Sequence, residues 1–196
     1  MNPGTPVTPI PYVPHTTIRP GRVLDHPLCP SSWVGIESIL ADLLSRFNVG
    51  RKFALEFGCE YGYSAIAFSN FFERVLTVDP FGQLTHQLHE MSRVAERNCA
   101  PYGNIEIVRM TWQRFTEAAN GASAAQFDLV HIDAEHNYEE CYGNGAWACE
   151  RSPVVVFHDT TSFPEVMRAV GDLAERYQRV FYNFEPCHGF GILVRP

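Results

Sequence analysis

The chain has 196 residues, of which 45% are hydrophobic and 19% charged, and its net charge is −7. A chain of this length forms one domain with a buried core. The acidic balance argues against nucleic acid or an anionic membrane as the main partner, because phosphates are bound by Lys and Arg. No apolar run approaches the roughly 20 residues that cross a bilayer, and the N-terminus lacks the pattern of a signal peptide.

The six cysteines, at positions 29, 59, 99, 141, 149 and 187, are scattered and include no Cys-x-x-Cys pair. This distribution suits free thiols in a reducing compartment better than disulfides or a zinc site. We therefore expect a cytoplasmic protein. The oligomeric state stays open, and a homodimer is compatible with the composition.

Residues 1–30 hold eight of the 14 prolines. Proline fixes φ and removes a backbone donor, so this proline-rich arm is expected to be extended or irregular. It is either a poorly ordered tail that packs on the domain or a flap over a functional site. The remaining residues, 31–196, are expected to form the domain itself.

Helical and strand patterns alternate from Ser31 onward. The first helix is expected behind a Ser cap, on the apolar spacing of Trp33, Ile36, Leu40, Leu43, Leu44 and Phe47. Strands are expected at 52–57, 74–78, 104–109, 127–132 and 153–157, and helices at 62–71, 84–99, 113–119, 137–149 and 163–177. This alternation predicts a parallel sheet covered by helices on both faces.

Two further strands, 180–184 and 190–195, end the chain. Only five residues, 185–189, join them, so the pair must be an antiparallel hairpin. The sequence therefore predicts an α/β fold, a doubly wound Rossmann-like sheet of seven strands that is mostly parallel, with an antiparallel last strand.

The turn from Gly58 to Gly62 follows the first of these strands. Ligands of doubly wound folds bind beyond the carboxyl ends of the strands, and a dinucleotide site has the pattern Gly-x-Gly-x-x-Gly there. Here Glu60 takes the position at which the backbone would approach a pyrophosphate, and Glu56 ends the strand. Two carboxylates repel phosphate. They suit a ligand with an amino group, a sulfonium and no phosphate, and S-adenosylmethionine is such a ligand.

Asp79 supports the same site. It ends the second strand, 21 residues after Gly58, close to the offset of roughly 20 residues at which a carboxylate binds ribose hydroxyls. Two simpler interpretations remain: Asp79 only turns the chain before Pro80, and the glycines only form a tight turn. The combination of both features in a complete βα series favours the nucleoside site.

These residues resemble the class I S-adenosylmethionine-dependent methyltransferases. The segment E-F-G-C-E-Y-G-Y-S, residues 56–64, is similar to their first motif, and V-L-T-V-D-P, residues 75–80, is similar to the second. The segments F-D-L-V-H-I-D-A-E-H-N-Y-E and V-V-V-F-H-D-T, at 127–139 and 154–160, resemble a subgroup that includes small-molecule and sugar O-methyltransferases. The resemblance covers about residues 55–196.

The resemblance implies a role for several of these positions at the methionine end of the cofactor. Glu56 would bind the methionine amino group, directly or through water. Gly58 and Gly62 would let the backbone approach the cofactor, and Ser64 would lie near its carboxylate end. Asp133, at the end of the fourth strand, is also expected to contact the cofactor.

At the nucleoside end, the resemblance implies that Asp79 holds the ribose. Thr111 and Trp112 fall where such enzymes contact adenine. Trp112 could stack on the base, or it could be an ordinary core or surface residue.

Methyl transfer requires a positioned nucleophile and removal of its proton. Asp133 ends the fourth strand, and His136 follows before Asn137, which with Glu140 has the pattern of a helix cap and its partner. His136 therefore lies outside the helix and is a candidate base, with Asp133 beside it. The alternative is an ordinary hydrogen-bonded loop histidine. His131, inside the strand, is expected to be a core residue.

Asp159 follows His158 at the end of the fifth strand. The segment Ser162-Phe163-Pro164-Glu165 has the pattern of a capping box for the next helix, which leaves Asp159 free. Together with Asp133 it could bind Mg²⁺, as some related methyltransferases do at these strand ends. Here His158 stands where those enzymes have a further ligand, and the alternative is an acidic cleft without metal.

The sequence thus predicts an S-adenosylmethionine-dependent O-methyltransferase whose acceptor is a hydroxyl of a small molecule, with or without a sugar. One alternative is a non-catalytic module that binds the cofactor, or has lost it, and serves a larger assembly. Another is a Rossmann-type NAD-dependent oxidoreductase, against which Glu60 argues. A protein or nucleic-acid acceptor also stays open, although the acidic charge disfavours nucleic acid.

Overall fold

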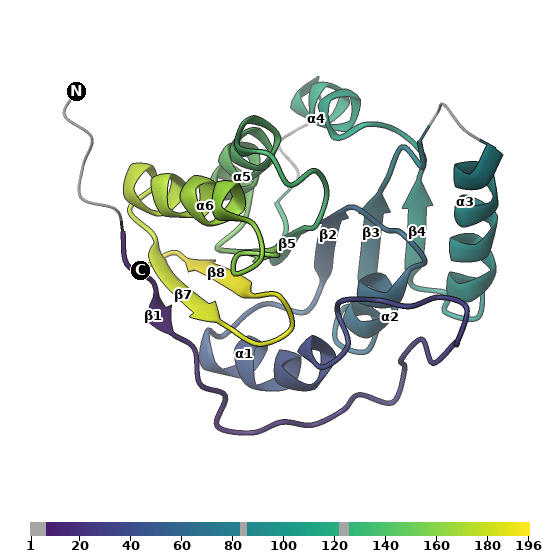
Figure 1. Cartoon of the computed structure of the whole chain (residues 1–196), viewed down its shortest axis with the longest axis horizontal. Coiled ribbons are helices and arrows are strands. Elements are labelled where there is room, and N and C mark those ends of the chain that lie inside the picture. The colour runs from purple at the N-terminus through teal and green to yellow at the C-terminus, as the bar shows by residue number, and fades with distance from the viewer. Residues whose placement is uncertain (1–6, 83–85, 122–125) are drawn as a thin grey trace.

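A computed structural model describes residues 7–82, 86–121 and 126–196 (Figure 1). Its centre is one sheet of eight strands in the order β1-β7-β8-β6-β5-β2-β3-β4. The strands are β1 (Ile10–Pro11), β2 (Phe53–Phe57), β3 (Arg74–Val78), β4 (Ile105–Val108), β5 (Leu129–Ile132), β6 (Val154–His158), β7 (Val180–Phe184) and β8 (Phe190–Val194). Among the described strands, only β8 runs antiparallel to its neighbours, β6 and β7.

The helices alternate with these strands as the sequence predicts. They are the 3₁₀ helix η1 (Ile36–Ile39), α1 (Leu40–Arg46), α2 (Tyr63–Ser69), α3 (His86–Cys99), α4 (Trp112–Gly121), α5 (Tyr138–Arg151) and α6 (Pro164–Arg176). Within the described residues, no helix is both long and apolar enough to span a membrane. The doubly wound sheet with its antiparallel last strand is confirmed, and the proline-rich arm adds β1 as an eighth strand.

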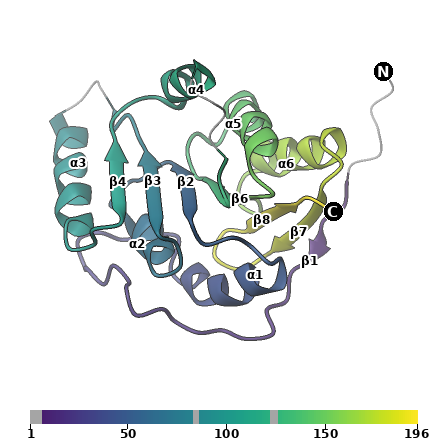
Figure 2. The same ribbon diagram turned by 180° about the vertical axis from the view of Figure 1, so that it is seen from behind.

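Helices cover the sheet on both faces. In Figures 1 and 2, α1 and α2 lie below the sheet, α5 and α6 lie above it, and α3 stands beside β4. Successive residues of a strand point to opposite faces. In β6, accordingly, Val154 and Val156 join the core between the sheet and helices α1 and α2. Val155 and Phe157 join the core between the sheet and helices α5 and α6.

The first helix begins later than predicted. Ser31 does not cap it; its hydroxyl oxygen instead accepts a hydrogen bond from the backbone N–H of Trp33, at 3.2 Å. Gly35 stands before η1 with φ of 107°, a left-handed conformation that interrupts a helix and favours glycine. A Cβ atom there would lie 2.8 Å from Sγ of Cys187. The close approach of the last hairpin therefore requires this break, which apolar spacing could not reveal.

The described part of the arm, from residue 7 onward, contacts the domain at several points. Its strand β1 pairs with β7 at the sheet edge, and the chain then passes beneath α1 and α2 (Figure 1). Asp42 of α1 fixes this path. Its carboxylate accepts hydrogen bonds from the Tyr12 hydroxyl at 2.5 Å, from the backbone N–H of His15 at 3.0 Å and from that of Thr16 at 3.3 Å.

Replacement of the Asp42 carboxylate should therefore destabilise the protein. We expect Asp42→Asn to lower the free energy of unfolding by about 1–3 kcal/mol, because one buried acceptor oxygen becomes an NH2 group that cannot accept and the charge paired with Arg46 is lost. Urea denaturation followed by circular dichroism measures the change. The control is Asp25→Asn, since the Asp25 side chain is 88% exposed in its ion pair with Arg19 and should change stability by less than about 0.5 kcal/mol. Equal stability of Asp42→Asn and the wild type would contradict this account of the arm.

Candidate functional site

The glycine turn after β2 is packed tightly on both sides. Gly58 and Gly62 have φ of 95° and 88°, and Glu60 between them has φ of 48°. A Cβ atom on Gly58 would lie 1.8 Å from the carbonyl oxygen of Asp133, and one on Gly62 would lie 2.7 Å from Sγ of Cys99. Both conformation and space therefore demand glycine at these two positions.

Asp79 holds this turn from the end of β3. One carboxylate oxygen accepts from the backbone N–H of Cys59 at 2.7 Å and from that of Glu60 at 3.1 Å. The other accepts from the N–H of Phe81 at 2.6 Å. Asp79 thus both turns its own chain and orders the glycine turn.

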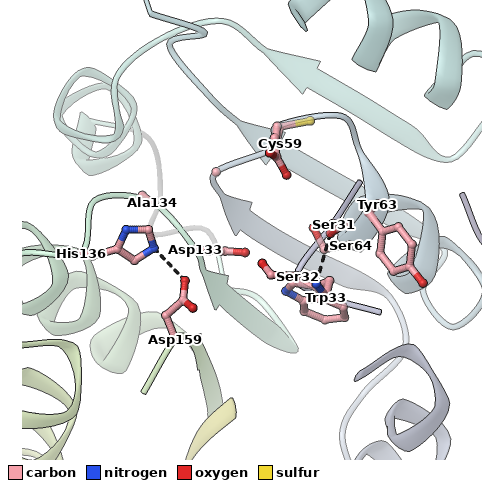
Figure 3. Close-up of a pocket in the computed structure, with 12 residues that line it drawn as sticks. Ser31, Ser32, Trp33, Cys59, Tyr63, Ser64, Asp133, Ala134, His136 and Asp159 are labelled. Carbon is pink, nitrogen blue, oxygen red and sulfur yellow. Dashed lines mark hydrogen bonds and ion pairs between the residues drawn. The ribbon is translucent and has the colours of Figure 1, made fainter. Parts of the chain in front are cut away.

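Two pockets meet at the turn. The first has a volume of about 210 Å³ and is lined by Ser31, Ser32, Trp33, Gly58, Cys59, Glu60, Tyr63, Ser64, Asp133, Ala134, His136 and Asp159 (Figure 3). The second has a volume of about 690 Å³, shares Gly58, Cys59, Glu60, Asp133 and Ala134 with the first, and extends to Asp79, Thr111 and Trp112. A ligand that crosses the turn would occupy both.

Most residues that the sequence singled out lie in these pockets. Glu56 is an exception, because its side chain is fully buried behind the turn and is not part of either lining. One of its oxygens lies 2.9 Å from Nδ1 of His131, and the other has no partner among the described residues. Gly62 also lies outside both linings. His131 is fully buried, as a core residue would be.

Four side chains at the ends of β5 and β6 form a cluster of carboxylates and imidazoles. Nε2 of His136 lies 2.7 Å from an oxygen of Asp159. Nδ1 of His158 lies 3.3 Å from one oxygen of Asp133 and 3.3 Å from one of Asp159. On its other side, Nε2 of His158 donates to the carbonyl oxygen of Cys187 at 3.0 Å, since a carbonyl can only accept.

The cluster shifts the titration of its members. Burial alone would lower the pKa of His158, but the two carboxylates beside it raise this pKa to about 10. The hydrogen bond to Asp159 raises the pKa of His136 above its ordinary value. Burial opposes ionisation of Asp159, yet His136 and His158 hold its pKa well below the usual range. Opposite charges are therefore paired in the cluster near neutral pH.

Glu60 extends the negative charge to the turn. Partial burial, Asp133 and Asp79 raise its pKa above the ordinary value for a glutamate, since a further carboxylate close to these two is harder to ionise. A cationic group bound at the turn would relieve this repulsion.

The donor set also fits a divalent ion. Asp133, His136 and Asp159 each offer a ligand atom, and these atoms lie within 4.8 Å of one another. Two carboxylates and an imidazole are suitable ligands for a divalent cation. His158 does not take part, because both of its ring nitrogens face other groups.

Two capping predictions have different outcomes. Asn137 caps α5 as expected, since its side chain accepts from the N–H of Glu140 at 3.0 Å, although the Glu140 carboxylate binds the indole N–H of Trp112 instead of completing a box. The prediction for Ser162 is wrong. Phe163 is the N-cap of α6, and no side chain caps this helix. The Ser162 hydroxyl instead lies 2.9 Å from Nδ1 of His188 in the last hairpin.

Several site residues were missed by sequence reasoning. Ser31, Ser32 and Trp33, which directly follow the arm, line the first pocket. Phe163 stacks on His136 at 4.2 Å between ring centroids. The apolar spacing identified Trp33 only as a helix position. No motif marks these residues, because their place depends on how distant segments pack.

A family model described as a methyltransferase domain matches residues 55–160. No curated protein matches the chain.

Solved structures share the fold. The O-methyltransferase from Bacillus cereus in complex with SAH is 16% identical, with a TM-score of 0.60 over 86% of this chain and 85% of that one. TomG, an O-methyltransferase from Streptomyces achromogenes involved in tomaymycin synthesis and in complex with SAM, is 19% identical, with a TM-score of 0.59 over 87% and 83%. The N-methyltransferase NodS from Bradyrhizobium japonicum is 16% identical, with a TM-score of 0.52 over 78% and 89%.

The tight packing of the turn predicts the effect of one added methyl group. Gly58→Ala should lower the free energy of unfolding by more than about 2 kcal/mol, because the left-handed backbone is strained and Cβ overlaps the carbonyl of Asp133. Thermal and urea denaturation measure the loss. Gly103→Ala is the control, since an added Cβ there meets nothing within 4 Å. Similar stabilities of the two variants would show that the turn can move away from β5.

Proposed function

The chain belongs to the methyltransferase domain family, and we propose that it transfers a methyl group from S-adenosylmethionine to a hydroxyl of a small molecule. This acceptor either carries a sugar or does not. The observation that carries the proposal is the meeting of two pockets at the glycine turn. The cofactor has a nucleoside at one end and an amino acid at the other, joined at the sulfonium. A cofactor laid across the turn would place its nucleoside in the second pocket and its methyl group beside His136 and Asp159.

The second pocket has suitable groups for a nucleoside. Asp79 lies at its edge, and one of its carboxylate oxygens accepts only from the N–H of Phe81, so this oxygen retains a lone pair for a ribose hydroxyl. The other oxygen already accepts from two backbone N–H groups of the turn. Trp112 presents its ring to the pocket while Glu140 holds its indole nitrogen, and Thr111 lies beside it. We propose that these three residues bind ribose and adenine.

The turn itself suits the charge of the cofactor. Glu60 and Asp133 line both pockets, so a sulfonium and an ammonium group at the turn would lie near two carboxylates. Gly58 and Gly62 keep the backbone free of side chains here, and Ser64 lies at the start of α2. Glu56 would contribute only through a water molecule or a small opening of the turn, because it lies behind it.

His136 is the proposed base. It is the most exposed member of the cluster, with 39% of its side chain exposed, and it lies in the first pocket. Asp159 orients its ring, and so does the stacked ring of Phe163. Asp159, whose carboxylate lies against the ring, stabilises the imidazolium that forms when His136 takes the acceptor proton. A neutral amine can attack a methyl group without first losing a proton, so a positioned base favours a hydroxyl acceptor over a nitrogen one.

We also propose Asp133 and Asp159 as ligands for a Mg²⁺ ion. When bound, the ion would acidify and orient the acceptor hydroxyl. His158 keeps both carboxylates in place for this purpose, from a position anchored to the last hairpin. The fold neighbours support the cofactor, since two of them are O-methyltransferases in complex with SAH or SAM.

Cofactor binding is the first test. Calorimetry at pH 8 should show saturable binding of S-adenosylmethionine. As the pH falls through the raised pKa of Glu60, this carboxylate loses its charge. Affinity for the cationic cofactor should then fall by about fivefold, because an ion pair contributes about 1 kcal/mol. Glu60→Gln should bind more weakly at pH 8 and lose this dependence. Saturable binding of NAD(H) in place of S-adenosylmethionine would favour the oxidoreductase alternative.

Turnover is the second test, measured as transfer of labelled methyl groups to a panel of phenols, polyols and glycosides. His136→Gln should lower turnover by about 10²–10⁴-fold and leave cofactor affinity unchanged, because the base acts on the acceptor. Wild-type turnover should rise with pH through a pKa above the ordinary 6.5 of histidine, since only neutral His136 accepts a proton. Asp159→Asn should lower this pKa.

The controls for turnover separate the alternatives. His26→Gln, outside both pockets, should act as the wild type. Full activity in excess EDTA would exclude the ion, and full activity of His136→Gln would exclude the base. Cofactor binding without turnover on any acceptor would favour the non-catalytic module.

A further inference from the structure

Trp33 carries a buried hydrogen-bond donor without a partner. Its side chain is 2% exposed, and Nε1 has no acceptor among the described residues. Buried indole N–H groups normally find a partner, because leaving one unpaired in the interior is costly. An unpaired donor in the lining of the first pocket therefore points to a ligand atom that accepts from it.

The indole ring cannot turn to find another partner. Three rings pack against it edge to face, with centroids at 4.9 Å for His131, 5.3 Å for Phe190 and 5.4 Å for Phe68. Figure 3 shows the nitrogen-bearing edge of the ring directed toward Asp133 and the Ser32 hydroxyl, into the pocket. Packing thus fixes the direction of the N–H bond.

Hydroxyl groups surround this donor. The Ser31 hydroxyl oxygen accepts from the Trp33 backbone N–H at 3.2 Å, which leaves its own proton for donation. Ser32 lies beside Trp33 in the lining, and Ser64 completes this side from α2. All four groups are neutral, and all can donate.

Three acidic side chains line the same pocket. They belong to Glu60, Asp133 and Asp159, and a dianion such as phosphate would be repelled. A ligand that fits must offer an acceptor to the neutral donors and a cation to the carboxylates. The amino-acid end of the cofactor has both groups, a carboxylate and an ammonium on the same carbon atom.

We propose that the segment directly after the arm binds the α-carboxylate of the cofactor, with Nε1 of Trp33 donating to one carboxylate oxygen and the Ser31 and Ser32 hydroxyls beside it. This inference rests on the proposed function. It makes this segment part of the cofactor site, although its residues precede the segment that the family model matches, 55–160. The last hairpin holds the segment here, since the Cys187 thiol donates to the carbonyl oxygen of Val34 at 3.1 Å.

Two ligands that differ at the amino-acid end give the test. S-adenosylhomocysteine has the carboxylate, and 5′-methylthioadenosine keeps the nucleoside and thioether without it. Trp33→Phe retains an aromatic ring and removes the N–H group. We expect this variant to bind S-adenosylhomocysteine at least tenfold more weakly in calorimetry, as for the loss of a hydrogen bond to a charged group, and to bind 5′-methylthioadenosine as the wild type does.

The matched control is Trp147→Phe, because Trp147 is also buried but its Nε1 lies 3.3 Å from Asn120, away from the pocket. It should bind both ligands normally. Unchanged affinity of Trp33→Phe for S-adenosylhomocysteine would overturn the proposal. An equal loss for both ligands would do the same, because it would show a structural role only.

A measurement on the wild type does not depend on the folding of any variant. Decarboxylated S-adenosylhomocysteine keeps the amino group, and it should bind at least tenfold more weakly than S-adenosylhomocysteine. Equal affinities would overturn the carboxylate assignment while leaving cofactor binding intact. If the wild type bound none of these nucleosides, the proposed function would fail together with this inference.

Discussion

The close approach of the ends of β2 and β5 is the constraint on which the site depends. The α-carbon of Gly58 lies so near the backbone of Asp133 that no side chain fits between them. This contact joins the glycine turn, where the cofactor is proposed to bind, to the strand end that carries Asp133. His136 follows on the same loop, so the binding turn and the proposed base are fixed relative to each other by backbone contact.

The charges of the site are balanced around His158. Asp133 and Asp159 lie at neighbouring strand ends, where two unpaired carboxylates would repel each other and resist ionisation. The imidazole of His158 lies between them and is fixed by the carbonyl of Cys187. A buried positive charge in this place offsets the repulsion between the two carboxylates, with or without a metal ion.

Segments from both ends of the chain complete the site. The segment directly after the arm brings Trp33 to the first pocket, and the last hairpin contacts both this segment and the β6 end. The arm is in turn fixed by Asp42 at its middle. The matched family segment therefore supplies the glycine turn and the cluster, whereas the proposed selection of the amino-acid end depends on residues outside it.

The sequence by itself determined the fold and the edge of the sheet at which the site lies. Apolar periodicity and glycine placement are local properties. They sufficed for the βα order, the terminal hairpin, the position of Gly58 in the turn and that of Asp79 at the end of the next strand. Tertiary structure decided the rest. It buried Glu56 against His131, broke the first helix at Gly35 and brought Trp33 into the pocket. These outcomes depend on contacts between segments far apart in the chain, which no local pattern of residues can encode.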